Sequence, residues 1–249
     1  MENKKIAIST KNLNKNFYVT EDATNTIKES LFNIFKRKSV VKFEALKNIN
    51  IDIYEGDRVA FIGSNGSGKT TLSKVLSGIY EPSNGEIKIE GTTMFLSLGI
   101  GMNDELTARE NIYISASILG LKIKEIDLLF DNIVEFSELG DFINRKVKFF
   151  SSGMKARLYY SIAVYAKADV IFLDEIFAVG DFSFAKKSER ILEETLLKNR
   201  TIVIVSHSFE TIRKYAHKVG YLKKGEMVFW GDVETGINMY LNDIGEKSE

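Results

Sequence analysis

The chain has 249 residues, of which 44% are hydrophobic and 27% are charged, and these proportions predict one large globular domain or a core with a smaller appended lobe. Its 34 basic and 34 acidic side chains cancel, so the net charge gives no reason to expect nucleic acid as a partner. The lack of cysteine in the sequence excludes disulfides, thiol catalysis and cysteine-based zinc sites. Apolar runs such as TIVIV are far shorter than the roughly 20 residues of a membrane-spanning helix, so we do not expect this chain alone to cross a bilayer.

Short β-branched runs alternate with longer helical patterns, which predicts βα units around a largely parallel sheet. From about residue 107 to 147 helical periodicity replaces the strand signal and predicts a helical lobe inserted between sheet strands. We expect one domain over 1–249, with this helical subdomain at about 100–150 and a short C-terminal helix and tail at about 231–249. The predicted strands cover residues 6–9, 49–53, 58–63, 86–91, 93–97, 170–174, 201–206 and 227–230.

One segment near the N-terminus departs from that alternation. Residues 24–38 read TNTIKESLFNIFKRK, and apolar side chains at i, i+4, i+7 and i+8 from Ile27 share one face of a predicted helix. Burial of this face is worth roughly 6–12 kcal/mol before opposing terms, whereas each basic residue of 36–38 gains only about 1 kcal/mol beside an anionic lipid surface. Burial therefore decides whether the helix packs on its own domain or on a membrane partner or lipid interface.

A glycine-rich loop follows the predicted strand RVAFI. Residues 63–71 read GSNGSGKTT and match the pattern G-x-x-x-x-G-K-[ST], followed by the helical pattern TLSKVLSG. In such a loop the glycines let backbone N–H groups turn inward around phosphate, Lys69 carries charge to the outer phosphates, and Thr70 offers its hydroxyl to Mg²⁺. The candidate phosphate-binding residues are Gly63, Ser64, Asn65, Gly66, Ser67, Gly68, Lys69, Thr70 and Thr71.

A second candidate anion site lies at residues 149–158, FFSSGMKARL. A Ser-Ser-Gly turn precedes a predicted amphipathic helix over 154–166, and the start of a helix presents unpaired backbone N–H groups and the positive end of the helix dipole. This stretch has no phosphate loop of its own. The residues alone therefore leave open whose phosphate it would hold.

Acidic residues follow a buried strand in VIFLDE. Asp174 and Glu175 fall at the carboxyl edge of the predicted sheet, where open α/β sheets bind ligands. Asp174 can hold the magnesium shell, and Glu175 can orient or activate a water for attack on a γ-phosphate. His207 follows the next such strand and could donate a hydrogen bond to that phosphate, whereas we interpret His217 as structural.

These pieces, in this order, resemble the ATP-binding subunits of ABC transporters over essentially the whole chain. The resemblance implies a P-loop NTPase (RecA-like) α/β core with an antiparallel β edge and an inserted α-helical subdomain, with ATP and Mg²⁺ as cofactors. FSSGM occupies the position of the family's signature, whose usual form is LSGGQ. In this family two subunits face each other head to tail, so the signature turn Ser151, Ser152 and Gly153 would contact ATP held on the Lys69 loop of a second copy.

The same resemblance implies roles for further residues. Asp181, in AVGD, matches the family's D-loop aspartate, which lies across the same dimer interface. Phe17, in LNKNF, sits where an aromatic side chain stacks on adenine, with Tyr18 as the alternative. Glu175 and His207 are the implied catalytic residues, and Thr70 and Asp174 the implied magnesium ligands.

Within the superfamily, the forms SSGMKARL, DEIFAVGDFSFAKK and ELTARENI are similar to the subunits that export O-antigen, capsular polysaccharide and wall teichoic acid. This likeness implies a peripheral ATPase at the cytoplasmic face of the bacterial membrane, driving a separate transmembrane permease that carries a lipid-linked polymer. It also favours a membrane-side position for the segment 24–38, because O-antigen exporters carry a gate-like helix in the same N-terminal insertion. The motifs do not distinguish among these polymers.

Two departures from the family pattern stand out. The family usually carries a glutamine between the sheet and the helical lobe that touches magnesium, but this sequence contains no glutamine, and Leu98 with Ser97 falls near that position. We interpret 97–104 as a surface that contacts the transmembrane partner. Some O-antigen subunits continue into a carbohydrate-binding domain, whereas this chain stops after GDVETGINMYLNDIG, so we expect no carbohydrate-binding domain and no direct sugar recognition.

Two other functions are open to a chain with these motifs. A non-transport ABC ATPase acting on DNA or ribosomes usually carries long coiled coils or two joined ATPase domains, and neither feature is present in these 249 residues. Because the glutamine is missing, the chain could also be an interaction module that binds ATP without useful hydrolysis. The presence of Asp174, Glu175 and His207 argues against this second function.

Overall fold

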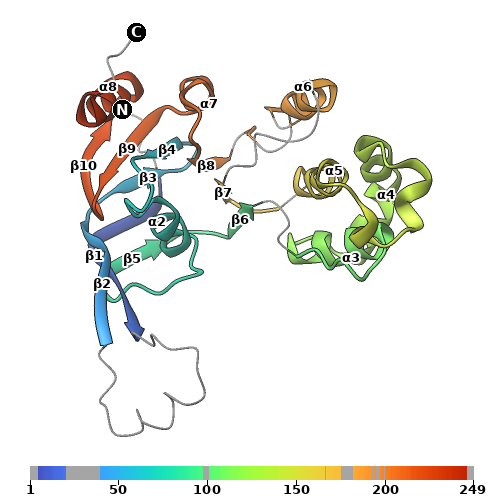
Figure 1. The fold of residues 1–249 in the computed structure, drawn as a ribbon, viewed down its shortest axis with the longest axis horizontal. Helices are drawn as coiled ribbons and strands as arrows, with labels where there is room; N and C mark the ends of the chain where they lie inside the picture. The colour runs from blue at the N-terminus through green and yellow to red at the C-terminus, as the bar shows by residue number, and fades with distance from the viewer. Residues whose placement is uncertain are drawn as a thin grey trace, which may run out of the picture.

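The computed structural model of the protein describes residues 5–20, 40–97, 101–165, 167–174, 182–191, 193–194, 197–198 and 200–245. The predicted helix at 24–38 lies outside these residues, as do Leu98, Glu175 and Asp181. Figure 1 shows two β-sheets on one side of the molecule and a group of helices on the other. The mixed α/β architecture that the sequence predicts is therefore confirmed.

The first sheet is antiparallel and is built around the long strand β1 (Ile6–Thr20). β1 pairs with β2 (Val40–Ile49), β3 (Asp52–Tyr54) and β5 (Asn84–Ile89). The predicted strand at 49–53 is divided between β2, which ends at Ile49, and β3, which begins at Asp52. β2 overlaps the run predicted at 49–53 only at Ile49; its outer residues 41–44 do alternate apolar and polar side chains, but all four are exposed, so no buried face marks this strand.

The second sheet has six strands in the order β10-β9-β4-β8-β7-β6. Five of these strands are parallel: β4 (Arg58–Ile62), β6 (Thr93–Ser97), β7 (Val170–Asp174), β8 (Thr201–Val205) and β9 (Lys218–Lys223). The edge strand β10 (Glu226–Gly231) pairs antiparallel with β9. The sequence analysis did not predict β9. Helix α2 (Lys69–Leu76) leaves the end of β4 and is the only helix of the described residues that contributes to the core between the two sheets.

Alternate residues of the central strands enter two different hydrophobic cores. Val59 and Phe61 of β4 belong to the core that the antiparallel sheet and α2 share. Ala60 and Ile62 of the same strand belong to the core that includes the helices on the far face. Both faces of these strands are therefore covered, which explains why runs such as VIFL are apolar throughout.

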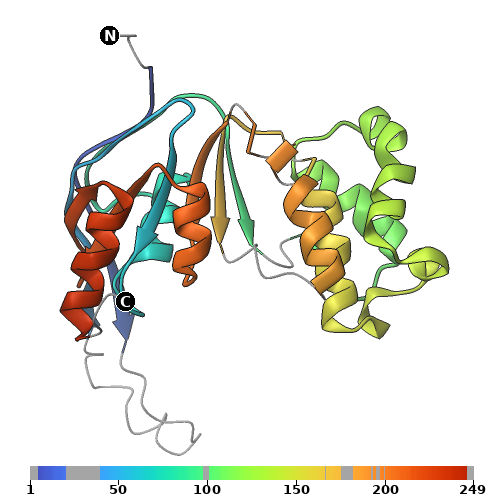
Figure 2. The ribbon, with the colours of Figure 1, turned by 90° about the horizontal axis from the view of Figure 1, so that it is seen from above.

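The helical group lies beyond the β6 edge of the second sheet in both views (Figures 1 and 2). It contains α3 (Ala108–Ile118), α4 (Ile123–Ser137), the short 3-10 turns Gly140–Asn144 and Val147–Phe149, and α5 (Ser152–Ala163). Helices α6 (Phe182–Ile191), α7 (Phe209–Tyr215) and α8 (Val233–Ile244) complete the described helices. None of the helices in the described part of the chain has the length and apolar character that a bilayer crossing demands.

Asn111, which is fully buried in α3, fixes the loop that enters the helical group. Its amide nitrogen donates to the carbonyl oxygens of Asn103 at 2.9 Å and Thr107 at 2.9 Å, and its Oδ1 accepts from the backbone N–H of Asn103 at 2.7 Å. One side chain thus satisfies three backbone groups of the segment before the helix.

We predict that Asn111→Ala lowers the free energy of unfolding by about 2–3 kcal/mol, because alanine removes three hydrogen bonds that a fully buried side chain makes to the segment before α3. Urea unfolding followed by circular dichroism measures the change. Asn132→Ala, at an exposed position of α4, is the matched control and should stay within about 0.5 kcal/mol of the wild type. Equal losses in the two variants would contradict the role given to Asn111.

Candidate functional site

The predicted phosphate loop leaves the end of β4 and enters α2 at Lys69, as its sequence context requires. Gly63 has a φ of +143°, and a Cβ at that position would lie 2.2 Å from the carbonyl oxygen of Leu222. Gly68 has a φ of +108°, and its Cβ would lie 2.8 Å from the carbonyl oxygen of Ala45. Only glycine fits these two positions, because both the left-handed backbone and the contact with main-chain oxygens exclude a side chain.

Neighbouring strands hold the loop in place through backbone hydrogen bonds. The N–H of Gly225, in the turn between β9 and β10, donates to the carbonyl oxygen of Ser67 at 2.9 Å. The N–H of Lys47, on β2, donates to the carbonyl oxygen of Gly225 at 2.8 Å. Both sheets therefore contribute to the shape of the loop.

Lys69 lies against the loop that it follows. It is 7% exposed, and its Nζ donates to the carbonyl oxygens of Gly63 at 2.7 Å and Ser64 at 3.0 Å. The hydroxyl of Ser67 is also buried and has no hydrogen-bond partner among the described residues. The loop thus places one positive charge and one unsatisfied polar atom at the start of α2, where the helix dipole favours an anion.

A cavity of about 230 Å³ opens in front of this loop. Asp174 at the end of β7 and His207 just after the end of β8 both line it. The two strands are parallel neighbours, and Asp174 of β7 lies opposite Val205 of β8. The structure therefore brings Lys69, Thr70, Asp174 and His207 to one edge of the sheet. The lining residues are Phe43, Ala45, Asn65, Gly66, Gly68, Lys69, Thr70, Thr71, Asp174, Val205 and His207.

Phe43 is the aromatic residue among those that line the cavity, and the sequence analysis missed it. It lies on β2, directly opposite Phe17 of β1, and its side chain is 54% exposed. Phe17 instead packs edge-on against Tyr80, with ring centroids 5.7 Å apart, and neither Phe17 nor Tyr18 lines the cavity. The cross-strand pairing with Phe17 could have indicated Phe43, but it requires β2 to be known.

The signature turn lies at the start of α5, away from the lining of that cavity. The hydroxyl of Ser151 accepts a hydrogen bond from the backbone N–H of Met154 at 3.2 Å and caps the helix. The helix therefore begins at Ser152, two residues before the predicted start, and ends at Ala163, whereas the predicted end at residue 166 lies outside the described residues. A Cβ on Gly153 would meet only the Ser151 hydroxyl, at 3.9 Å, so its own chain does not require glycine there.

The ABC transporter family matches residues 46–178, more than half of the 249-residue chain and the part that contains the phosphate loop, the signature turn and Asp174. The chain belongs to this family.

Curated relatives of this ABC chain include proteins named teichoic acids export ATP-binding protein TagH. The one from Enterococcus faecalis is 39% identical over 237 residues, which are 95% of this chain and 53% of the relative. The one from Staphylococcus epidermidis is 36% identical over 235 residues, which are 94% of this chain and 88% of the relative. The chain thus spans about half the length of the first relative and most of the second.

Solved structures show the same fold at lower identity. A dimeric ATP-binding cassette in a post-hydrolysis state with ADP and phosphate has a TM-score of 0.70 at 22% identity, covering 91% of this chain and 98% of its own. An ATP-binding subunit of an ABC transporter has a TM-score of 0.70 at 20% identity, covering 98% of this chain and 95% of its own. The expectation of an ABC ATPase fold is therefore confirmed.

The ABC site offers oxygen ligands of the kind that Mg²⁺ prefers. Thr70 and Asp174 line the same cavity, and Ser97 of β6 pairs directly with Asp174 of β7. No group of three or more His, Cys, Asp or Glu residues that could hold a metal occurs among the described residues. A few oxygen donors fit Mg²⁺, which keeps several waters and binds through carboxylates together with substrate phosphates.

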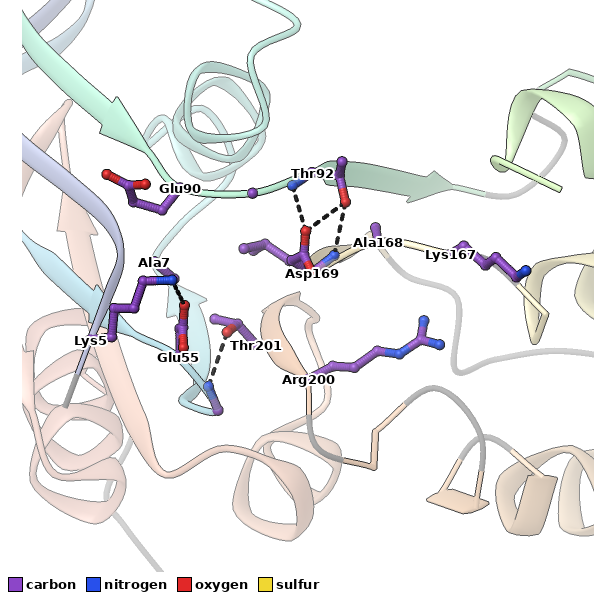
Figure 3. Close-up of a pocket in the computed structure, with 13 residues that line it drawn as sticks. Lys5, Ala7, Glu55, Glu90, Thr92, Lys167, Ala168, Asp169, Arg200 and Thr201 are labelled. Atoms are coloured by element: carbon purple, nitrogen blue, oxygen red, sulfur yellow. Dashed lines mark hydrogen bonds and ion pairs between the residues drawn. The ribbon is translucent and has the colours of Figure 1, made fainter. Parts of the chain in front are cut away.

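A larger cavity, of about 610 Å³, lies at the opposite edge of the sheet, where its parallel strands begin (Figure 3). Several of its charged groups already have partners: Lys5 pairs with Glu55 at 2.6 Å, and Asp169 accepts from the N–H and hydroxyl of Thr92. The hydrogen bonds from Thr92 hold the pKa of Asp169 below its ordinary value. The phosphate loop does not line this cavity, so the chemistry of the lining residues favours the smaller cavity as the candidate nucleotide site.

The two loop glycines with different surroundings provide a direct test of this site. We predict that Gly63→Ala weakens ATP binding by at least about tenfold, because the added methyl group meets a backbone oxygen and must displace β9 or the loop. Gly66→Ala is the control: its φ is also positive, at +77°, but nothing lies within 4 Å of the added Cβ. Titration with a fluorescent ATP analogue measures both, and an equal effect would contradict the role of the Leu222 contact.

Proposed function

We propose that this chain is the ATP-hydrolysing subunit that energises export of a lipid-linked wall teichoic acid across the cytoplasmic membrane, through a separate permease. The observation that carries the proposal is that the phosphate loop, Asp174 and His207 all line one cavity. The names of the relatives support teichoic acid as the polymer class, ahead of O-antigen or capsular polysaccharide.

In the proposed reaction a water attacks the γ-phosphate in line with the leaving ADP. Lys69 and the loop N–H groups hold the phosphates, and Glu175 orients the water and accepts its proton. His207 donates a hydrogen bond to the γ-phosphate from the end of β8. Bound Mg²⁺, held by Thr70 and Asp174, would neutralise charge on the β- and γ-phosphates. Positioning and charge stabilisation thus supply most of the rate acceleration.

The proposed active unit is a dimer of two copies of this chain. Ser151 and Gly153 begin a helix whose free N–H groups suit an anion, yet they do not line the cavity of their own phosphate loop. We therefore infer that the signature turn binds the γ-phosphate of ATP held by the second copy, with Asp181 at the same interface. The open space around Gly153 leaves room for that close approach.

The proposed permease contact lies around residues 97–104 and the neighbouring face of α3. Ile114 and Ile118 are exposed apolar side chains one turn apart on that helix. A Cβ on Gly101 would lie 3.0 Å from the Cδ1 atom of Ile118, so Gly101 lies against this helix. Binding of a membrane-embedded partner there would place the chain at the cytoplasmic face of the membrane. The membrane-side position of the helix predicted at 24–38 stays a prediction.

We predict that Lys69→Ala and Ser151→Ala are each inactive alone but recover hydrolysis when mixed. In the mixed dimer the intact loop of one copy meets the intact signature turn of the other, so up to about a quarter of the wild-type rate should return. Phosphate release, measured with and without the permease, gives the result. Two folded variants that form mixed dimers without regaining activity would count against a shared site.

Phe43 is the proposed adenine-stacking residue, in place of Phe17 or Tyr18, because it lines the cavity. We predict that Phe43→Ala weakens ATP binding by about five- to tenfold, the worth of one aromatic stack. Tyr18→Ala is the matched control, since Tyr18 is 68% exposed on the adjoining strand and does not line the cavity. Isothermal titration of both variants decides the assignment, and a larger loss in Tyr18→Ala would reverse it.

A further inference from the structure

The loop before α3 is joined by main-chain hydrogen bonds to the segment that leads into the signature turn. The N–H of Lys148 donates to the carbonyl oxygen of Asp104 at 2.9 Å. The N–H of Val147 donates to the carbonyl oxygen of Leu106, also at 2.9 Å. The approach to Ser151 is therefore held by backbone groups, whichever side chains surround it.

Asp104 also contacts the chain beyond the signature turn, through its side chain. The Nζ atom of Lys155 donates to Oδ2 of Asp104 at 2.5 Å. Lys155 belongs to the first turns of α5, where its backbone N–H donates to the carbonyl oxygen of Ser151 at 3.0 Å. One residue of the loop thus meets the chain on both sides of the turn, at Lys148 before it and at Lys155 after it.

This ion pair is too exposed to be explained by stability. The Asp104 side chain is 56% exposed and that of Lys155 is 34% exposed, and an ion pair in such surroundings contributes little to the free energy of unfolding. It does restrict where the start of α5 can lie relative to the loop. The position of a group that contacts phosphate matters more to the rate than to folding, because a displacement of about 1 Å can slow catalysis by a large factor.

A second acidic residue on the same loop provides a comparison. The carboxylate of Glu105 pairs with Lys148 at 2.9 Å and with Lys146 at 3.6 Å. Both lysines precede the signature turn, where the backbone hydrogen bonds already hold the chain. The ion pairs of Glu105 therefore repeat an existing connection, whereas the ion pair of Asp104 adds a connection to α5.

We propose that Asp104 is a positioning residue for the signature turn: through Lys155, its carboxylate fixes the start of α5 in the place where that turn meets ATP on a second copy. Asp104 does not line the nucleotide cavity of its own chain, so its influence is exerted on the ATP of the partner copy. This inference rests on the proposed function, because it assumes the shared site that Ser151 completes.

The test uses the mixed dimer of Lys69→Ala and Ser151→Ala copies, whose one working site combines the loop of the Ser151→Ala copy with the signature turn of the Lys69→Ala copy. Asp104→Asn placed in the Lys69→Ala copy should lower phosphate release per mixed dimer about three- to fivefold. The same substitution in the Ser151→Ala copy should change nothing, because that signature turn is already disabled. Glu105→Gln in the Lys69→Ala copy is the matched control and should leave the rate unchanged.

Two further measurements separate positioning from folding. Lys155→Met added to Asp104→Asn in the same copy should cause no further loss, because the two side chains act as one pair. Thermal unfolding of Asp104→Asn should give a Tm within about 4 °C of the chain without it, as expected for an exposed ion pair. A larger fall in Tm would mean that Asp104 maintains the fold, and would overturn the inference.

Other results overturn the inference in distinguishable ways. An equal loss from both placements of Asp104→Asn would mean that the residue acts on the whole domain rather than on its own signature turn. No loss from either placement, or the same loss in Glu105→Gln, would mean that the ion pair with α5 does not position the turn. A further loss on adding Lys155→Met would mean that the two residues act separately. If the mixed dimer fails to hydrolyse ATP even without these substitutions, the proposed shared site falls, and this inference with it.

Discussion

The shape of the phosphate loop depends on main-chain hydrogen bonds that come from outside it. The carbonyl oxygen of Ser67 accepts from the N–H of Gly225, and the carbonyl oxygen of Gly225 accepts from the N–H of Lys47. The turn between β9 and β10 therefore joins the loop to β2 of the antiparallel sheet. Gly63 and Gly68 lie against main-chain oxygens of those same neighbours. The loop can therefore present its N–H groups to a phosphate only when both sheets are in place.

In the proposed dimer, the second lobe contributes to the site by a different route. Helix α5 starts with a serine cap and carries its free N–H groups on a surface apart from the nucleotide cavity. The helix packs on α3 and α4, and from its middle the hydroxyl of Tyr160 donates to the carbonyl oxygen of Ser188 on α6. A helix fixed so firmly at its middle and exposed at its start suits a contact made by rigid-body approach of another chain.

The sequence predicts those parts of the fold and site that local patterns encode. The phosphate loop, Asp174 and His207 follow from residues adjacent to apolar strands, and the parallel pairing of β7 and β8 then brings their ends together. Phe43 could not be predicted in this way, because its place depends on the pairing of β2 with β1 across the intervening residues. Such features arise from contacts between distant segments, which local periodicity does not carry.

The alternation of β4, β7 and β8 between the two cores has a thermodynamic consequence. Each of these strands sends one set of side chains to the core of α2 and the antiparallel sheet, and the other set to the core of the helical lobe. Neither core can lose its packing without exposing one face of the same strand backbone. The two lobes are thus expected to share a single cooperative unfolding unit, even though they lie on opposite sides of the molecule.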